Sequence, residues 1–449
     1  MSAHATKHVE SDERLVLGEG AKPLVVFGAV AAVVGIVAAI ALGYSRSSGF
    51  QPFLFAYLAA YAFCLSIVLG ATFFVLIQYL TRAGWSVGVR RIPEHIMGLM
   101  PWMALLAIPM VLSVVIQRGE LYSWAQPLSV ATPQAIAAAQ KGEAGEAVET
   151  PSAQESENPA HRPLDAITLQ KRGWLNPWFF VLRMVVYFAI LLGITSFYRN
   201  QSLRQDTTAD PNITRRLQAC AGFCVVIFGL TLTGLAGDLF MSLDPHWFST
   251  IWGVYYFAGC TLANFSTLII IVWLLQRAGY LRNTITIEHY HDLGKYLFGF
   301  TFFWGYIAFS QYMLLWYANI PEEIEWFNRH GATTVAAHIT GWSYVIVALL
   351  FGQLLIPFAG LLSRHVKRKP NILILWALWV LSFHLLDTIW IVMPEYPARF
   401  SASMVVLTAA AVIGMGGLLL MLFIRGLLGQ NLRPAADPRL PESLAFQNV

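Results

Sequence analysis

Long apolar segments recur along the whole chain, and they constrain its fold more than any other feature. A helix of about 20 apolar residues is long enough to cross the hydrocarbon core of a membrane. Inside a bilayer the backbone cannot bond to water, so such segments form helices that satisfy their own hydrogen bonds. The sequence therefore predicts an all-α polytopic membrane protein. Ten transmembrane helices are predicted, at about 24–43, 53–81, 94–116, 177–198, 216–240, 250–278, 293–319, 335–362, 371–393 and 402–428.

The charged residues support this class and orient the chain. Only 12% of the 449 residues are charged, whereas soluble domains carry about 25%. The connections on the side of both chain ends hold 20 lysines and arginines, and those on the opposite side hold 8. Because positive charge concentrates in cytoplasmic loops, both termini are predicted to be cytoplasmic. The net charge of +4 reflects this sidedness, so no nucleic-acid partner is expected.

Four regions follow from this layout. They are a cytoplasmic N-terminal tail (1–23), a ten-helix transmembrane domain (24–428), a long periplasmic loop inserted within it (117–175) and a cytoplasmic C-terminal tail (429–449). The middle of the loop lacks large apolar residues and cannot bury a core, so it is expected to be mobile or draped over a partner. Its PQAIAAAQKGEA stretch favours a short helix. The Pro-punctuated C-terminal tail is expected to extend along a partner.

Redox ligands are not evident in the sequence. The four cysteines all fall within predicted spans, and no CxxCH or multi-cysteine motif is present, so covalent haem and iron–sulfur clusters are not expected. His338 and His384 lie in the same half of the membrane, but their depths differ by roughly 8 Å at a rise of 1.5 Å per residue. That difference argues against a bis-histidine haem. No metal site is predicted.

The segment GDLFMSLDPHWFST, at 237–250, joins two apolar spans at the outer face. It brings Asp238, Asp244 and His246 to a membrane edge, where ionisable groups are costly and are functional candidates. Two structural alternatives stay open. Asp244, Pro245 and His246 can form a turn that begins the next helix, with Ser249 as its cap. Asp238 can simply end its helix in water.

Further polar candidates lie inside the outer half of the spans. His384 and Asp387 are three residues apart and share a helix face, and a buried carboxylate needs a partner or a proton. Arg183 is expected either to reach outward to the interface or to form a local ion pair. His338 is a further candidate. Four residues of the seventh span are added to these candidates: Tyr306, Ser310, Gln311 and Tyr317.

A second polar group precedes the seventh span on the cytoplasmic side. The stretch TIEHYHDLGK contains Glu288, His289, His291 and Asp292, and Glu94 precedes the third span. One interpretation is a capped helix start with a carboxylate at the positive end of the helix dipole. The other is a cytoplasmic entrance for protons.

Two long strings within 237–323 resemble a known family. They are MSLDPHWFSTIWGVYYFAG and ITIEHYHDLGKYLFGFTFFWGYIAFSQYMLLWYANIPEE. They are similar to the F subunit of bacterial alternative complex III, often described as a second quinone-binding subunit. That subunit belongs to the wider NrfD and polysulfide-reductase membrane-subunit family. Such complexes are quinol:cytochrome c or cupredoxin oxidoreductases of respiratory or photosynthetic electron-transfer chains, in the bacterial inner membrane.

The resemblance implies a fold of two four-helix bundles plus two further helices. It also implies no redox centre in this chain, with iron–sulfur clusters and c-type haems carried by partner subunits and a homologous C-type membrane subunit alongside. The family draws a quinone such as menaquinone from the membrane quinone pool, and the resemblance implies that either this chain or, with the better case, the C-type subunit binds it. Quinol is oxidised near the outer face in this family, and proton translocation is suggested for it. A chain without redox ligands therefore supplies at most one wall of a quinol site or a proton path.

Two other functions stay open. One is a purely structural membrane anchor whose outer polar groups dock extrinsic redox subunits. The other is an ion or solute transporter, for which Pro109 and Pro357 inside spans would mark the broken helices typical of that class.

Overall fold

The structure is a computed structural model that describes residues 13–44, 50–141, 164–332, 339–396 and 401–447. Within these residues, nine helical segments are long and apolar enough to cross a membrane. The chain is therefore an all-α, multi-pass membrane protein, as predicted. One expected span is not among these nine helical segments. It is the seventh along the chain, 293–319, which forms the 32-residue helix α11, Ile287–Ala318.

The remaining helices have these bounds: α1 Lys22–Tyr44, α2 Gln51–Leu80, α3 Val87–Met97, α4 Met100–Leu106, α5 Ile108–Val115, α6 Pro133–Lys141, α7 Ala166–Gln170, α8 Pro177–Thr208, α9 Pro211–Leu239, α10 Trp252–Arg277, α12 Pro321–Arg329, α13 Gly341–Leu349, α14 Ile356–Leu362, α15 Arg364–Lys367, α16 Pro370–Val392, α17 Ala402–Leu427 and α18 Leu440–Leu444.

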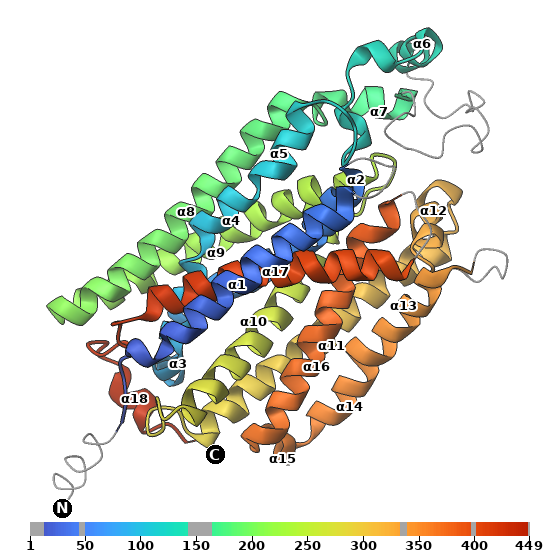
Figure 1. Ribbon diagram of the computed structural model, residues 1–449. Helices are drawn as coiled ribbons and strands as arrows, with labels where there is room; N and C mark the ends of the chain where they lie inside the picture. The colour runs from blue at the N-terminus through green and yellow to red at the C-terminus, as the bar shows by residue number, and fades with distance from the viewer. Residues whose placement is uncertain (1–12, 45–49, 142–163, 333–338, 397–400, 448–449) are drawn as a thin grey trace, which may run out of the picture.

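The helices pack as two groups and one pair (Figure 1). In one group, α2 packs on α3 and α9, and α8 packs on α9 and on α3 to α5. In the other, α10 packs on α11 and α16, while α13 and α14 pack on α16. Helices α1 and α17 pair with each other beside α2.

Glycines permit the closest helix contacts, because small residues let two backbones approach each other. A Cβ atom on Gly70 of α2 would lie 2.0 Å from the Cys260 carbonyl oxygen of α10. A Cβ atom on Gly35 of α1 would lie 2.3 Å from the Gly414 nitrogen of α17. Helices α2 and α10 thus join the two groups at the centre of the molecule, and both are mostly buried within it.

Two predicted spans are broken, and proline explains both breaks. The segment at 94–116 forms α3, α4 and α5, and Pro101 and Pro109 stand in the first turns of α4 and α5. Proline lacks the amide proton that continues a helix. The segment at 335–362 contains a π-helical turn, Leu350–Leu355, just before Pro357. Such turns are frequent at functional sites.

Both described ends of the chain lie at one end of the bundle, here called the terminal end, and the opposite end is called the loop end (Figure 1). The C-terminal tail packs on its own chain. It forms α18, and Asp437 bonds to Arg90 at 2.5 Å. Phe446 packs against Trp85 and His289. Buried side chains of the same chain thus hold the tail in place.

The long loop is partly anchored at the loop end. Tyr122 donates a hydrogen bond to the Leu239 carbonyl at 3.0 Å, and Trp124 donates to the Ser242 carbonyl at 2.9 Å. Both side chains are buried. The short helix expected in PQAIAAAQKGEA is present as α6. Residues 142–163, at the centre of this loop, lie outside the described residues.

Candidate functional site

A fully buried polar cluster surrounds Asp387 on α16. The Tyr255 hydroxyl of α10 donates to one carboxylate oxygen, and Trp304 Nε1 of α11 donates to the other at 3.2 Å. His384 Nδ1 lies 3.9 Å from the same carboxylate. His384 and Asp387 are each only 1% exposed, so the helix face that their spacing predicts they share points inward. We call Ser66, Tyr255, Trp304, His384 and Asp387 the Asp387 cluster.

His384 also contacts α2. Its Nε2 atom lies 2.9 Å from Ser66 Oγ, and Ser66 Oγ lies 2.7 Å from the Phe63 carbonyl. The Ser66 hydroxyl has one proton, which it can donate to the carbonyl or to the imidazole, so the tautomer of His384 depends on that choice. The His384 Nδ1 atom is on the Asp387 side of the ring and has no hydrogen-bond partner among the described residues.

Gly259 of α10 makes room for this histidine. A Cβ atom at that position would lie 2.7 Å from His384 Cε1. Real Cβ atoms do not approach another atom so closely, so any larger residue would displace the imidazole ring. The glycine therefore positions His384 against Ser66.

Arg183 and Asp238, which the sequence treats as separate candidates, form one bidentate ion pair near the loop end. Nε lies 2.7 Å from Oδ2 and Nη2 lies 2.8 Å from Oδ1. The Trp174 carbonyl accepts a further bond from Arg183 at 2.8 Å, and the Trp174 and Phe179 rings cover the guanidinium. Asp238 is 2% exposed, so it does not end its helix in water. Of the two alternatives predicted for Arg183, an outward reach to the interface and a local ion pair, the structure has the ion pair.

The turn that contains Asp244 and His246 holds a second ionic network. Asp244 accepts from the His246 backbone nitrogen at 2.9 Å and also pairs with Arg329. His246 pairs with Asp165 from the long loop. Hydrogen bonds to Asp165 and then Asp244 raise the pKa of His246 to about 9. Burial alone would raise the pKa of Asp244, but its bonds to His246 and Arg329 hold that pKa below the usual range.

The turn is therefore tied to neighbouring elements and does more than begin a helix. Ser249 does not cap α10, whose N-cap is Ile251. Instead the Ser249 hydroxyl donates to the Gln311 side chain at 3.1 Å. Gln311 is buried, as expected for an amide in this span.

Three candidates of the seventh span lie apart from the Asp387 cluster. Tyr306 and Tyr317 stand on the exposed face of α11, and Ser310 is only partly buried. Their helical spacing places them on one stripe of α11, and that stripe faces away from the interior. Trp304 and Gln311 occupy the inward face of the same helix. His338 lies outside the described residues.

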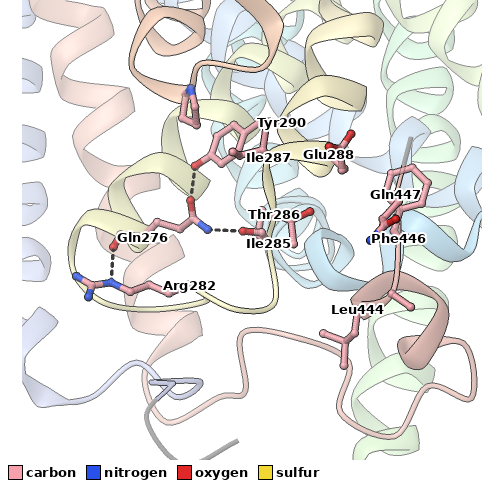
Figure 2. Close-up of a pocket in the computed structure, with 12 residues that line it drawn as sticks. Gln276, Arg282, Ile285, Thr286, Ile287, Glu288, Tyr290, Leu444, Phe446 and Gln447 are labelled. Atoms are coloured by element: carbon pink, nitrogen blue, oxygen red, sulfur yellow. Dashed lines mark hydrogen bonds between the residues drawn. The ribbon is translucent and has the colours of Figure 1, made fainter. Parts of the chain in front are cut away.

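The polar residues at the terminal end belong to two separate groups. In the first, Glu288 pairs with Arg368 at 2.9 Å, and Asp292 pairs with Lys295 at 2.5 Å. Figure 2 shows a pocket of about 660 Å³ at this end, lined by Glu288, Thr286, Arg282 and the 444–447 segment. His289 lies at the start of α11 and contacts Ser443 at 3.1 Å. His291 is buried beside this group.

Glu94 belongs to the second group and does not line that pocket. It accepts from Arg90 and Arg91 at 3.0 Å each and from Ser202 at 2.7 Å. Arg91 continues the network to Asp206 on α8. The expectation that Glu94 shares one entrance with Glu288 is therefore not met, because its carboxylate faces α8.

Sequence reasoning missed Ser66, Tyr255 and Trp304. Each is a single polar or aromatic residue in an apolar helix, and such residues usually mark an interface or a packing position. The only available signal was that the carboxyl of Asp387 requires donors. Gln353, in the π-helical turn, is fully buried, and neither its amide nitrogen nor its carbonyl oxygen has a partner among the described residues.

No group of three or more histidine, cysteine, aspartate or glutamate residues that could hold a metal ion occurs in the described part of the chain. Comparison with protein-family models and with curated proteins finds no match to this chain.

Proposed function

We propose that this chain is a membrane subunit of a quinol-oxidising complex in the bacterial inner membrane, and that its Asp387 cluster carries protons. The contacts of the candidate carboxylates support this choice. Asp238, Asp244, Glu94, Glu288 and Asp292 are each paired with an arginine or lysine. Asp387 instead contacts the neutral donors Tyr255 and Trp304. It can therefore gain or lose a proton without breaking an ion pair to arginine or lysine.

His384 gives such a proton a next position. Its Nδ1 atom lies 3.9 Å from the Asp387 carboxylate, just beyond direct hydrogen-bond distance. An ionisable residue inside a membrane domain is costly to keep and marks proton or ligand pathways by default. At the terminal end, the pocket beside Glu288 provides space for water, which suits an entrance for protons (Figure 2).

Oxidation of a quinol releases two electrons and two protons. The proposed role of this chain is to accept or conduct the protons, and to line one side of a quinone or menaquinone pocket at the loop end. Partner subunits with iron–sulfur clusters and c-type haems would take the electrons to cytochrome c or a cupredoxin. A homologous C-type subunit would stand beside this chain. The resemblance of the 237–323 strings to alternative complex III supports this assignment of partners.

The proposal is tested by Asp387→Asn in the purified complex. We expect turnover with a quinol analogue to fall at least tenfold, because asparagine keeps the shape of aspartate but does not titrate. Tyr255→Phe should produce a smaller loss in the same direction. The matched control is Tyr256→Phe, because Tyr256 is equally buried and donates only to the Ala62 carbonyl.

Full turnover and full proton release in the assembled Asp387→Asn complex would overturn the proton-carrying role. That result would favour a purely structural anchor. The ion pairs of Asp238 with Arg183 and of Asp244 with Arg329 also suit an anchor, because they hold helices together. A transporter receives less support. In transporters, broken helices occupy corresponding positions in the two halves. Here the broken span α3 to α5 is the second span of the first helix group, whereas the broken span α13 to α14 is the third span of the second group.

A further inference from the structure

A groove runs along one stripe of α11, starting near the terminal end. It has a volume of about 460 Å³ and is lined by Asp292, Lys295, Tyr296, Gly299, Phe300 and Phe303. These residues cover eleven helical steps, or about 16 Å at 1.5 Å per residue. That length is close to half of the roughly 30 Å hydrocarbon core. The groove therefore matches a single leaflet of a membrane.

The floor of the groove is a rigid stack of aromatic rings. Tyr296 stacks on Phe265 with ring centres 5.0 Å apart and on Trp85 at 5.9 Å. Phe300 stacks on the same Phe265 ring at 5.5 Å. Gly299 leaves the middle of the groove open, because a Cβ atom there would meet no atom within 4 Å. Such an apolar floor offers contact area to a flexible hydrocarbon chain and makes no hydrogen-bond demand on it.

The end of the groove nearest the terminal end is polar and contains Asp292 and Lys295. Lys295 is half exposed there and pairs with Asp292. Helix α15 lies at the same end of the molecule and carries the exposed residues Arg364 and His365 (Figure 1). His291, one helical turn before Lys295, is only 8% exposed, and its Nδ1 atom has no hydrogen-bond partner among the described residues.

We propose that this groove binds one anionic phospholipid of the leaflet at the terminal end. Lys295 holds the headgroup phosphate, and one acyl chain lies over Tyr296, Gly299 and Phe300. Basic sites at the ends of membrane helices bind anionic headgroups. A quinone fits less well, because its neutral headgroup gains nothing from this cation. A peptide fits less well, because the apolar floor offers no partners for backbone groups. The proposal is independent of the proton-carrying role.

Native mass spectrometry of the detergent-solubilised full chain tests the site. The probes are phosphatidylglycerol, phosphatidylethanolamine and menaquinone, each added to delipidated protein. We expect phosphatidylglycerol to bind best and Gly299→Leu to lower its affinity at least tenfold by filling the groove. Lys295→Gln should weaken binding about fivefold, which corresponds to about 1 kcal/mol for one basic residue at an anionic surface.

The control is Gly229→Leu, because Gly229 is also an exposed helical glycine at which an added Cβ atom would meet no atom within 4 Å. It should bind phosphatidylglycerol like the wild type. The Lys295→Gln variant leaves the groove shape intact, so it keeps the test informative should Gly299→Leu fold poorly. Unchanged binding in Lys295→Gln, or tighter binding of menaquinone or phosphatidylethanolamine than of phosphatidylglycerol, would overturn the proposal.

Discussion

Arg183 of α8 and Asp238 of α9 form a bidentate ion pair, with nitrogen–oxygen distances of 2.7 and 2.8 Å, in the buried part of the helix bundle. The two residues are 55 positions apart in the chain. Each charge of the pair compensates the other in an apolar environment. The pair also fixes the loop ends of two neighbouring helices. Either residue alone would be costly there, so the pair is best understood as one structural unit.

Replacing Arg183 with methionine should lower the free energy of unfolding by about 3–5 kcal/mol, because Asp238 would stay buried without a partner. The double variant Arg183→Met with Asp238→Leu should recover most of that loss. Denaturant unfolding in detergent measures both. The control is Glu19→Gln, which breaks an exposed pair with Lys22 and should change stability by less than about 1 kcal/mol. Equal effects of the single and double variants would contradict the ion-pair explanation.

Gly259→Ala should disturb the Asp387 cluster from the opposite helix. The new methyl group would lie 2.7 Å from the His384 ring, so the ring must move away from Ser66. Overpacking of this kind costs about 1–3 kcal/mol, which thermal unfolding would report. The control is Gly237→Ala, where the nearest atom to the new Cβ is 3.9 Å away. Similar melting temperatures for the two variants would show that His384 is not confined by Gly259.

His246 should make stability depend on pH in the alkaline range. Its pKa is raised from 6.5 to about 9 by hydrogen bonds to Asp165 and Asp244. A group with a raised folded-state pKa contributes fully below its unfolded pKa, so this stabilisation is present below about pH 6.5 and is lost as pH rises through 9. The side chain is nearly half exposed, so the contribution should stay below about 1 kcal/mol.

Thermal unfolding between pH 6 and pH 10 measures that effect. His246→Gln should be less stable than the wild type at pH 6 and similar to it at pH 10. A difference that stays constant over this range would show that the imidazolium does not contribute through Asp165 and Asp244.

Asp437→Asn should loosen the C-terminal tail. The Asp437 carboxylate meets Arg90 at 2.5 Å, and both side chains are buried. Loss of this charge leaves Arg90 with Glu94 alone and should cost about 3 kcal/mol. Faster protease release of a C-terminal tag and a lower melting temperature are the expected results. Glu442→Gln, in an exposed pair of the same tail, should leave both measurements unchanged.

Several parts of the candidate site could be predicted from the sequence, and others could not. The spacing of His384 and Asp387 indicated a shared face, which the structure has. Their partners Ser66, Tyr255 and Trp304 come from three other helices. Helical periodicity reveals which side of a helix is buried, but it does not reveal which helix lies opposite. Arg183 and Asp238 were both candidates for the same reason, without any indication that they meet.

The sequence by itself determined the membrane class, the positions of most spans and the breaks at Pro109 and Pro357. These are local properties, because the length and apolarity of a segment decide whether it enters a bilayer, and proline lacks a backbone donor wherever it stands. Tertiary structure alone decided which charges are paired and which carboxyl is left with neutral donors. Asp437 pairs with Arg90 at a separation of 347 residues in the sequence, and Asp387 accepts a hydrogen bond from Tyr255 at a separation of 132 residues. Such pairings depend on how helices pack, which no local pattern contains.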